Sequence, residues 1–543
     1  MKVIAAIEAD LHRSPIGTAS RLRDDLIGCP VLRRTVRRVR RARRVDSVHV
    51  VTDPDQRDAV ADVLQGLDAV IETHGAGAPS WQDRVRRARK WSLDSWRGGV
   101  GGLCGFDEQI HAGALAALGR RDQADVVASI PAAAVLVDPS LLDAMIDHFE
   151  IQAADTRLVF CQAMPGLAAL LAQPEILEEL HRAGHPPGAL LTYIPDNPQP
   201  DLTTRPCCYI VPGIVAETSG RILADTRRGM ELLTEILAHE REDTLSAERI
   251  CRFVAERCTA HLDRLPREVE LELTVEDPLP DTLLRPRGSR VPRRGPIPVA
   301  LVRRIAHELG QYDDSLMLLG GFGEPLLHPN LAEVLAACRE GGVFGLAVRT
   351  NGLAMRDDVI DLLIDHDVDV INVTIDAHSA ETYRALNRVD GFEQVRANVE
   401  ALLSRRRERQ RGPLVVPELA KVRGTLPEQE AFFDHWLRRV GWANIVSPSH
   451  YAHQLPEQAV MNLAPPRRSR CGRLWSRATV LADGTVVTCD QDYAARQPVG
   501  HVGTESLEAI WTGPRLAAVR SAHTNRTWGE LPLCAACDEW HRP

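Results

Sequence analysis

The sequence predicts an α/β protein of three parts: an N-terminal α/β sandwich, a central partial (β/α)6 barrel and a small C-terminal domain held by metal-binding cysteines. Strand-like apolar runs alternate with helical patterns through residues 1–235, and a second such series begins near residue 267. Four cysteines then gather between residues 471 and 537. Because 543 residues exceed what one ordinary core accommodates, several domains are expected.

Composition and charge limit the classes of function. Hydrophobic residues make up 44% of the chain and charged residues 26%, as in soluble globular proteins. The net charge of -9 gives no support for a nucleic-acid partner. The opening "MKVIAAIEADLHR" is too short and too acidic for a signal peptide, and no run of about 18 apolar residues could span a membrane. We therefore expect a cytoplasmic protein without a membrane span.

The N-terminal sandwich is predicted from four apolar runs, "KVIAAIEA", "SVHVVTD", "DVVASI" and "RLVFCQA", with helical patterns between them. The arginine-rich run from Leu32 to Arg44 first suggests a nucleic-acid patch. Leu32, Val36 and Val39 recur at helical spacing, however, so we expect an amphipathic helix whose arginines cover its solvated side.

The barrel is predicted from six βα units in residues 266–460, after a helical linker over 236–265. Its strands are expected near 267–274, 315–319, 344–349, 369–375, 413–418 and 443–446, with helices that include 299–310, 329–340, 355–365 and 391–408. The Arg/Pro-rich stretch 285–298 is expected to be a loop.

The last four of the twelve cysteines form the predicted metal site of the C-terminal domain, residues 461–543. They are Cys471, Cys489, Cys534 and Cys537. The stretch "ATVLADGTVVTC" predicts a hairpin turning at Asp483-Gly484, which would bring Cys471 and Cys489 to the same end. Four thiolates hold a tetrahedral zinc ion or an iron–sulfur cluster. A zinc ribbon usually pairs two CxxC knuckles, so a cluster is favoured, with zinc and unrelated thiols as the alternatives.

The cysteine spacing, with twelve residues between Cys471 and Gly484, and the stretch "GHVGTESLEAIWTGPRLAAVR" resemble the SPASM domain. That domain extends many radical S-adenosylmethionine (SAM) enzymes and holds auxiliary [4Fe–4S] clusters. The resemblance implies one [4Fe–4S] cluster here, because the longer cysteine set of two-cluster members is missing.

Further upstream, "LLGGFGEPLLHP", "VRTNGL" and "INVTIDAHSAETYRALN" resemble motifs of the radical SAM barrel. Each follows a predicted parallel strand, where an α/β barrel builds its site. The resemblance implies two sets of SAM-contacting residues: the GxGEP motif Gly321, Gly323, Glu324 and Pro325, and the pocket residues Asn351, Thr374 and Asp376. Taken singly, each has a structural explanation as a turn, a loop cap or a helix cap.

The first barrel strand departs from the family pattern. "LELTVEDPLPDTLLRP" keeps Glu272 and Thr274 of the pattern E-x-T-x-x-C, but the three cysteine positions of CxxxCxxC fall on Asp277, Asp281 and Leu284. Carboxylates match an iron–sulfur cluster poorly and leucine cannot ligate it. No CxxxCxxC occurs elsewhere in the chain. We therefore expect no SAM-cleaving cluster, which argues against radical chemistry and leaves SAM only as a candidate ligand of the barrel pocket.

The N-terminal part resembles GT-A-like nucleotidyltransferases, especially the spore-coat polysaccharide cytidylyltransferase family, through "IGCPVL" and "DVVASIPAAAVLVDPSLLDAMI". The resemblance implies a Rossmann-type sandwich. The family's metal-binding aspartate falls on Ala133, Asp138-Pro139 is kept, and only Arg13 and Arg21 remain of the basic loop. Nucleotidyl transfer needs a divalent ion, so this activity is not supported.

These observations favour an iron–sulfur protein of radical SAM/SPASM architecture, similar to spiro-SPASM proteins, that has lost the ligands of the SAM-cleaving cluster. It would be a non-radical enzyme or a redox or binding protein for a small molecule or peptide, with glycan or envelope biosynthesis suggested by analogy. One alternative is a nucleotidyl- or glycosyltransferase with unusual metal ligands such as Asp107 and Glu108. Another is an active radical SAM enzyme that recruits Cys251 and Cys258. The sequence identifies no catalytic residue.

Overall fold

A computed structural model of the chain describes residues 1–75, 79–108, 111–191, 200–240, 242–260, 262–280, 282 and 284–542, without the side chains of 243 and 258–260. The chain forms two compact units, Met1–His261 and Leu262–Pro543. None of the helices in these described ranges has the length and apolar character needed to cross a membrane. The finer boundaries at 235, 265 and 460 remain predictions.

The first unit is built on a mixed seven-stranded sheet in the order β3-β2-β1-β4-β6-β5-β7. Neighbours β1, β2, β3 and β4 are parallel, whereas β6 runs antiparallel to β4 and β5. The strands are β1 (Val3–Ala9), β2 (Ser47–Thr52), β3 (Val70–Thr73), β4 (Val126–Pro131), β5 (Leu158–Cys161), β6 (Leu170–Ala172) and β7 (Cys208–Tyr209). The four strands predicted for this part are confirmed as β1, β2, β4 and β5.

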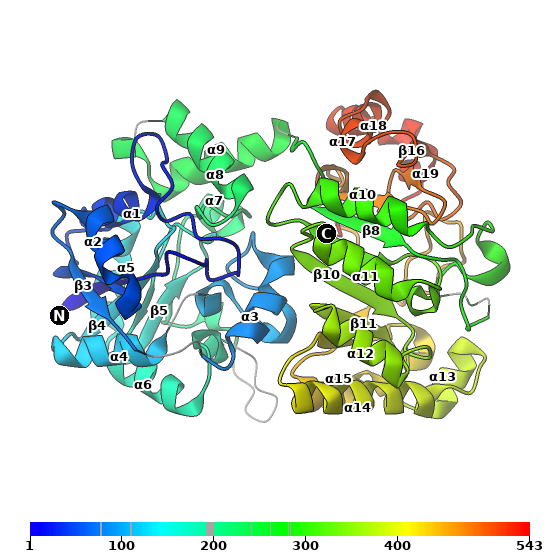
Figure 1. Cartoon of the computed structure of the whole chain (residues 1–543), viewed down its shortest axis with the longest axis horizontal. Helices are drawn as coiled ribbons and strands as arrows, with labels where there is room; N and C mark the ends of the chain where they lie inside the picture. Colours follow the sequence, from blue (N-terminus) through cyan, green and yellow to red (C-terminus); the bar gives the residue numbers. More distant parts are fainter. Residues whose placement is uncertain are drawn as a thin grey trace. The chain divides into compact units, whose positions relative to one another are not determined.

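Helices cover both faces of this sheet because β1 is apolar on both sides. Val3, Ala5 and Ile7 belong to one core cluster, and Ile4 and Ala6 belong to another on the opposite face. The second cluster includes α4 and α6, which lie side by side in Figure 1. The helices are α1 (Val31–Val39), α2 (Arg57–Leu64), α3 (Gln82–Arg89), α4 (Ala112–Arg121), α5 (Pro139–Gln152), α6 (Pro174–Ala183), α7 (Gly213–Glu217), α8 (Arg227–His239) and α9 (Ala247–Ala260).

The arginine-rich run forms α1, whose apolar face is buried as predicted. The prediction that its arginines are solvated is wrong for Arg34 and Arg38, which are both buried. Arg38 donates to three carbonyl oxygens, those of Val137 (2.7 Å), Glu242 (2.8 Å) and Leu245 (2.5 Å). These bonds satisfy a cation that would otherwise be costly to bury. Part of the basic run therefore holds the fold together.

The second unit contains a nine-stranded sheet in the order β13-β12-β11-β10-β9-β8-β14-β15-β16. Strands β8 to β13 are parallel and follow one another in chain order, which confirms the predicted βα series. The strands are β8 (Glu268–Glu272), β9 (Leu316–Gly320), β10 (Gly345–Thr350), β11 (Val370–Thr374), β12 (Leu414–Ala420), β13 (Asn444–Val446), β14 (Arg477–Val480), β15 (Thr485–Val487) and β16 (Pro498–His501).

Figure 1 shows four helices one after another along this sheet: α10, α11, α12 and α14. Their order along the sheet is their order in the chain. The helices of the second unit are α10 (Val299–Leu309), α11 (Leu331–Glu340), α12 (Asp357–Asp365), α13 (Ala380–Asn387), α14 (Phe392–Arg409), α15 (Gln429–Val440), α16 (Arg473–Ser476), α17 (Leu507–Trp511), α18 (Pro514–Thr524) and α19 (Pro532–Ala535). The stretch 285–298 is a loop, as predicted, interrupted by one 3-10 turn, Gly288–Arg290.

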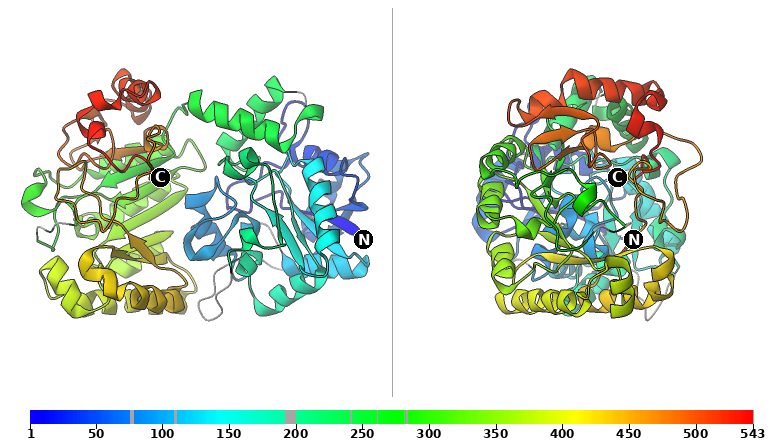
Figure 2. Two further views of the ribbon diagram at one scale, coloured as in Figure 1. Left: turned by 180° about the vertical axis from the view of Figure 1, so that it is seen from behind. Right: turned by 90° about the vertical axis from the view of Figure 1, so that its right-hand side faces the viewer.

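The C-terminal segment extends the barrel sheet. Strand β14 pairs in parallel with β8, from Arg477 opposite Glu268 to Val480 opposite Leu271. Strands β14 and β15 form the predicted hairpin, in which Gly484 takes a left-handed φ of +90° at the turn. Figure 2 shows the orange and red C-terminal segment at the β8 end of the sheet and the yellow helices at the opposite end. The cysteine-bearing tail is thus joined to the barrel by main-chain hydrogen bonds.

We expect the substitution Arg38→Met to lower the free energy of unfolding by about 3 kcal/mol, because three buried carbonyl groups lose their donor. Urea denaturation followed by circular dichroism would measure this change. Arg37→Met, on the exposed side of the same helix, should change stability by less than about 0.5 kcal/mol. Equal effects of the two substitutions would contradict a structural role for Arg38.

Candidate functional site

The four C-terminal cysteines converge on one small cavity of about 20 Å³. Cys471 precedes α16, Cys489 follows β15, and Cys534 and Cys537 lie in and just after α19. The β14–β15 hairpin brings the first two together, and the CxxC spacing brings the last two together. The cavity wall also includes the apolar side chains of Leu474, Leu533 and Trp540. The predicted thiol site is therefore assembled in the structure.

Cys534 is buried and the other three cysteines of the site are half-buried, and the thiols of Cys489, Cys534 and Cys537 have a pKa raised by burial and by neighbouring thiols. Burial is the main cause of the raised pKa of Cys534, to about 12, and the neighbouring Cys537 and Cys471 add to it. Burial likewise raises the pKa of Cys537 to about 11 and that of Cys489 well above its ordinary value. Four crowded thiols that cannot ionise alone become thiolates when a metal centre neutralises their charge.

Main-chain amides point at three of the four sulfur atoms. The amide of Glu539 donates to Sγ of Cys537 over 3.3 Å. Burial raises the pKa of Cys471 and of Cys489, and main-chain amides oppose that rise: those of Arg473 and Leu474 at Cys471, and that of Gln491 at Cys489. Such N–H donors stabilise negative charge on ligating sulfur and tune the metal centre behind it. The donor set therefore fits a thiolate-bound metal group.

The spacing of the sulfur atoms bears on which group is held. Among the described residues, the only group of three or more potential ligand atoms that all lie within 4.8 Å of one another is His450, His453 and Asp538. The cysteine sulfurs are therefore spread more widely than the edge of about 3.8 Å that a Zn–S distance of about 2.3 Å gives for tetrahedral zinc. This spacing does not fit tetrahedral zinc.

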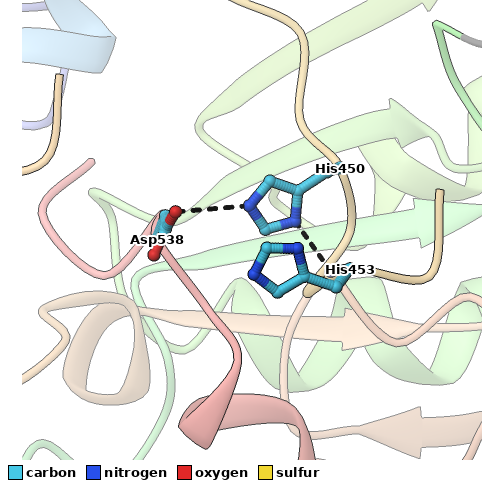
Figure 3. Close-up of side chains that lie close together, drawn as sticks. All are labelled: His450, His453 and Asp538. Atoms are coloured by element: carbon cyan, nitrogen blue, oxygen red, sulfur yellow. Dashed lines mark hydrogen bonds and ion pairs between the residues drawn. The ribbon is translucent and has the colours of Figure 1, made fainter. Parts of the chain in front are cut away.

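The two histidines and Asp538 form a hydrogen-bonded link (Figure 3). The amide of His453 donates to Nδ1 of His450 over 2.7 Å, so the neutral His450 ring carries its hydrogen on Nε2. That atom faces Oδ2 of Asp538 at 3.5 Å. Both ring nitrogens are thus used within the protein. The link ties the loop after β13 to the residue that follows Cys537.

At the barrel end, a buried ion pair occupies the first expected cysteine position. Oδ2 of Asp277 lies 3.0 Å from Nε of Arg287, and the two side chains are 3% and 5% exposed. Oδ1 of Asp277 accepts from Nδ2 of Asn351 at 3.1 Å and from the amide of Leu279 at 2.8 Å. Both carboxylate oxygens are therefore engaged. These contacts do not fit a cluster ligand.

The third expected cysteine position, Leu284, is buried in an apolar cluster with Ala420 and Val422. Asp281, at the second position, lies outside the described residues. The two described cysteine positions, Asp277 and Leu284, thus supply one engaged carboxylate and one hydrocarbon side chain. Neither can bind three irons of a cluster.

Glu324 of the GxGEP motif is buried and bonded entirely within the protein. Oε1 accepts from the hydroxyl of Thr350 at 2.8 Å, and Oε2 accepts from the amide of Asn351 at 2.8 Å. Glu324 also caps the short 3-10 helix η9 (Pro325–Leu327) through the amide of Leu326. Burial raises the pKa of Glu324 to about 7.

The two glycines of the motif permit close packing of neighbouring loops. A Cβ atom at Gly323 would lie 2.3 Å from the carbonyl oxygen of Thr274, and one at Gly321 would lie 2.6 Å from Cβ of Glu272. Gly321 also has a left-handed φ of +87°. The loop after β9 therefore rests directly on the loop after β8, which requires glycine at both positions.

The remaining pocket residues join the same polar network. Asp376 has a φ of +60°, accepts from the amide of Ala420 at 3.0 Å and lies 3.4 Å from Arg285. The hydroxyl of Thr374 donates to the carbonyl of Thr350 at 3.2 Å. The structure thus places Asn351 beside Asp277 and Glu324, and Asp376 beside Arg285. Their role in binding SAM stays a prediction.

The arginines of the 285–298 loop are the functional-site residues that the sequence did not identify. Besides Arg285 and Arg287, Arg294 pairs with Glu272 at 2.7 Å. Oε1 of Glu272 also accepts from the amide of Ala482 at 3.0 Å, in the C-terminal hairpin. The only sequence signal for these contacts was composition: the 285–298 loop is rich in arginine, and the stretch before it is rich in acidic residues.

In the first unit, the two proposed metal ligands are engaged by other groups. Asp107 accepts from the amides of Cys104 (2.7 Å) and Gly188, and burial raises its pKa to about 6. Glu108 lies between Arg89 at 2.7 Å and Arg221 at 2.8 Å. Neither carboxylate offers an open position to a metal ion.

The other residues of the first unit that the sequence singled out lie at a helix cap, in the core and along a cavity. Asp138 caps α5 through the amide of Ser140 at 2.9 Å and also accepts from the amide of Ala247. Cys251 is buried in the core with α9, whereas the side chain of Cys258 lies outside the described part. Arg13, Arg21 and Ala133 line a cavity of about 410 Å³.

Comparison with known proteins agrees with the architecture of the second unit. Residues 285–418 match the family model of the Radical SAM superfamily, and residues 471–538 match that of SPASM, an iron–sulfur cluster-binding domain. The first match begins just past the three cysteine positions. The second unit therefore has radical SAM/SPASM architecture, and its C-terminal part matches a domain that binds iron–sulfur clusters.

The similar proteins differ in what their names state. An uncharacterized protein of Treponema pallidum is 27% identical over 317 residues, 55% of this chain and 84% of that protein. A GTP 3',8-cyclase of Edwardsiella ictaluri is 32% identical over 139 residues, 25% of this chain and 40% of the cyclase. Among solved structures, SuiB of Streptococcus suis bound to the precursor peptide SuiA has a TM-score of 0.41 at 12% identity, covering 54% of this chain and 80% of SuiB.

The raised pKa of Glu324 predicts a pH-dependent stability. Below about pH 4.5 the carboxyl is protonated in both the folded and the unfolded chain, so it has no effect. As the pH rises to about 7, the unfolded chain loses this proton and the folded chain retains it, which destabilises the fold by about 3 kcal/mol. Glu324→Gln removes this titration, so wild type should lose that stability relative to the variant between these pH values.

Urea unfolding at several pH values would measure this difference. Glu381→Gln, exposed on α13, serves as the matched control and should follow wild type throughout. A constant difference between wild type and Glu324→Gln across the range would contradict the buried, proton-retaining state of Glu324.

Proposed function

We propose that this protein is an iron–sulfur protein with one [4Fe–4S] cluster on Cys471, Cys489, Cys534 and Cys537, and that it has lost radical SAM chemistry. It acts as a non-radical enzyme or as a redox or binding protein for a small molecule or peptide. The Asp277–Arg287 ion pair, at the position of the first cluster cysteine, is the observation that carries the proposal.

The loss of radical chemistry follows from the chemistry of the barrel end. Reductive cleavage of SAM needs an electron delivered to its sulfonium by a cluster that binds it directly. Asp277 is held by Arg287 and Asn351, and Leu284 is packed in apolar surroundings. A thiolate-bound cluster has no ligand in either residue. The barrel therefore serves as a scaffold or a binding site.

The C-terminal residues are arranged to hold a charged group away from water. Buried Arg473 pairs with Asp490 at 2.7 Å and places positive charge near Cys471 and Cys489. Arg468 donates to the carbonyl of Cys534 at 2.7 Å, which fixes the CxxC turn. When bound, the cluster supplies a one-electron redox centre or a structural cross-link. The apolar wall and the amide donors would set its potential.

The cellular setting is proposed from the cysteines and from the resemblance of the N-terminal part. A cytoplasmic location is supported by the thiols, because all the cysteines in the described part of the chain are free of disulfides. A link to glycan or envelope biosynthesis rests on the resemblance of residues 1–235 to GT-A-like cytidylyltransferases. A metal-dependent transferase is disfavoured, since Asp107 and Glu108 are engaged by amides and arginines.

Anaerobic purification should yield about four irons and four sulfides per chain, as expected for one [4Fe–4S] cluster. Cys537→Ser should lower the iron content well below that value because one of four ligands is lost. Cys338→Ala, a buried cysteine in α11 of the same unit, is the matched control and should keep the iron. About eight irons per chain would contradict the loss of the barrel cluster, and stoichiometric zinc would contradict the cluster itself.

Reduced protein incubated with SAM should produce no 5′-deoxyadenosine above a SAM-only background, because no cluster is available to the sulfonium. Liquid chromatography of the reaction mixture would measure this product. The assay requires protein that carries the C-terminal cluster on Cys471, Cys489, Cys534 and Cys537. Multiple turnovers of 5′-deoxyadenosine would refute the proposed loss of radical chemistry.

A further inference from the structure

The cavity of the cysteine site is lined by one histidine that lies outside the cysteine pattern. His523, in the last turn of α18, is 2% exposed and forms part of the cavity wall. Its ring nitrogen Nδ1 accepts a hydrogen bond from the amide of Cys471 over 3.2 Å. An imidazole that accepts at Nδ1 is neutral and carries its hydrogen on Nε2. His523 is therefore a hydrogen-bond donor at Nε2.

The Nε2 atom of His523 is buried and has no hydrogen-bond partner among the residues that the structure describes. A buried donor without an acceptor destabilises a fold, because it has lost its hydrogen bond to water. In native proteins such atoms mark strained, catalytic or ligand-binding places. The imidazole thus holds one expected ligand, Cys471, through Nδ1 and offers an unused N–H at Nε2.

Four other polar side chains of the cavity wall are engaged with the protein. Each has a partner in a neighbouring loop or turn, so it differs in this respect from Nε2 of His523. The pairs are Arg473 with Asp490 (2.7 Å), Glu539 with Arg542 (2.8 Å), Thr488 with the carbonyl of Gln497 (3.2 Å) and Gln491 with Ser449 (2.7 Å).

The ring of His523 is held in place by an aromatic and a basic neighbour. The ring centroid of Trp528 lies 6.0 Å from that of His523. Arg468 lies over the Trp528 ring at 5.0 Å and donates to the carbonyl of Cys534 at 2.7 Å. Nε of Arg468 also lacks an acceptor, but the Trp528 ring already lies against this guanidinium. Contacts thus connect Cys471 to Cys534 around the cavity wall, and the orientation of the imidazole is fixed before a group binds.

An N–H donor suits the chemistry of a group bound by thiolates. Four thiolates give an iron–sulfur cluster a net negative charge, and one-electron reduction adds to that charge. Hydrogen bonds to the sulfur atoms stabilise the reduced form more than the oxidised form, so they raise the reduction potential. Main-chain amides already serve Cys471, Cys489 and Cys537 in this way. A side-chain donor at Nε2 would act in the same direction.

We propose that His523 is a positioning residue of the cysteine site, which holds Cys471 through Nδ1 and donates from Nε2 to a sulfur atom of the bound cluster. This hydrogen bond raises the reduction potential of the site. The inference rests on the proposed function, since it needs an iron–sulfur cluster on the four cysteines. It adds to the site a residue that the cysteine spacing does not contain.

Two substitutions separate the roles of the two ring nitrogens. His523→Asn keeps an acceptor near the position of Nδ1 and removes the distant donor, whereas His523→Gln keeps a donor near the position of Nε2. The full chain, loaded with its cluster, is titrated anaerobically with a reductant and followed by electron paramagnetic resonance. His523→Asn should shift the equilibrium about fivefold toward the oxidised form, a potential about 40 mV lower, since a tenfold change is about 59 mV for one electron.

His523→Gln should keep a potential close to that of wild type. His307→Asn, exposed on α10 of the same unit, is the matched control and should also keep it. An unchanged potential in His523→Asn would overturn the proposal. A lower potential in His523→Gln alone would overturn it as well, because the contact with Cys471 would then be the one that matters.

A further measurement needs no variant that folds. In wild-type protein with isotope-labelled histidine nitrogen, pulsed electron paramagnetic resonance of the reduced cluster should detect one weakly coupled nitrogen. No coupling would overturn the proposal, and a strong coupling would overturn it in favour of direct ligation by His523. Iron content separates this inference from the proposed function: wild type with about four irons and no coupling contradicts the role of His523 alone. Wild type without iron contradicts both.

Discussion

At the end of the barrel, the carboxylate of Asp277 and the guanidinium of Arg287 meet out of contact with solvent, and neighbouring loops are organised around them. Removing one member of such a pair leaves an uncompensated buried charge and typically costs 3–5 kcal/mol. Asn351 connects this pair to Glu324, so the ends of β8, β9 and β10 share one polar network. Arg294 and Glu272 extend the network to the C-terminal hairpin through the amide of Ala482. The geometry of the second unit depends on these internal partners, which occupy the place where a cluster would otherwise organise the loops.

Charge is balanced in opposite ways at different places in the molecule. The acids and arginines of the barrel end satisfy one another, and buried Arg38 is satisfied by carbonyl groups. At the C-terminal thiols, Arg473 and main-chain amides supply positive charge. Crowded thiols favour a metal centre. The cysteine site is thus the place where the protein leaves part of its charge balance to a bound group.

Much of this organisation could be predicted from local pattern. The strands of the βα series, the apolar face of α1 and the hairpin at Asp483-Gly484 follow from side-chain periodicity and turn chemistry. The partners of Asp277 could not be predicted, because the loop containing Arg287 has no periodic pattern and its contacts cross loops rather than strands. The burial of Arg34 and Arg38 was missed for a related reason: the carboxylate of Glu242 that pairs with Arg34, and the carbonyl groups that accept from Arg38, lie far away in the sequence. The pairing of β14 with β8 also joins positions about two hundred residues apart, beyond the reach of local signals.

That pairing has a consequence for synthesis on the ribosome. Strand β8 has β9 on one side and β14 on the other, so its second edge stays open until residues 477–480 have emerged. For the time needed to translate more than a third of the chain, a growing barrel exposes a row of unpaired main-chain groups that another nascent chain could pair with. Until Arg477 emerges, Glu268 lacks this partner, and its negative charge would discourage such contacts by repulsion between identical copies. Folding yield during rapid expression should therefore depend on how soon the tail arrives to complete the sheet.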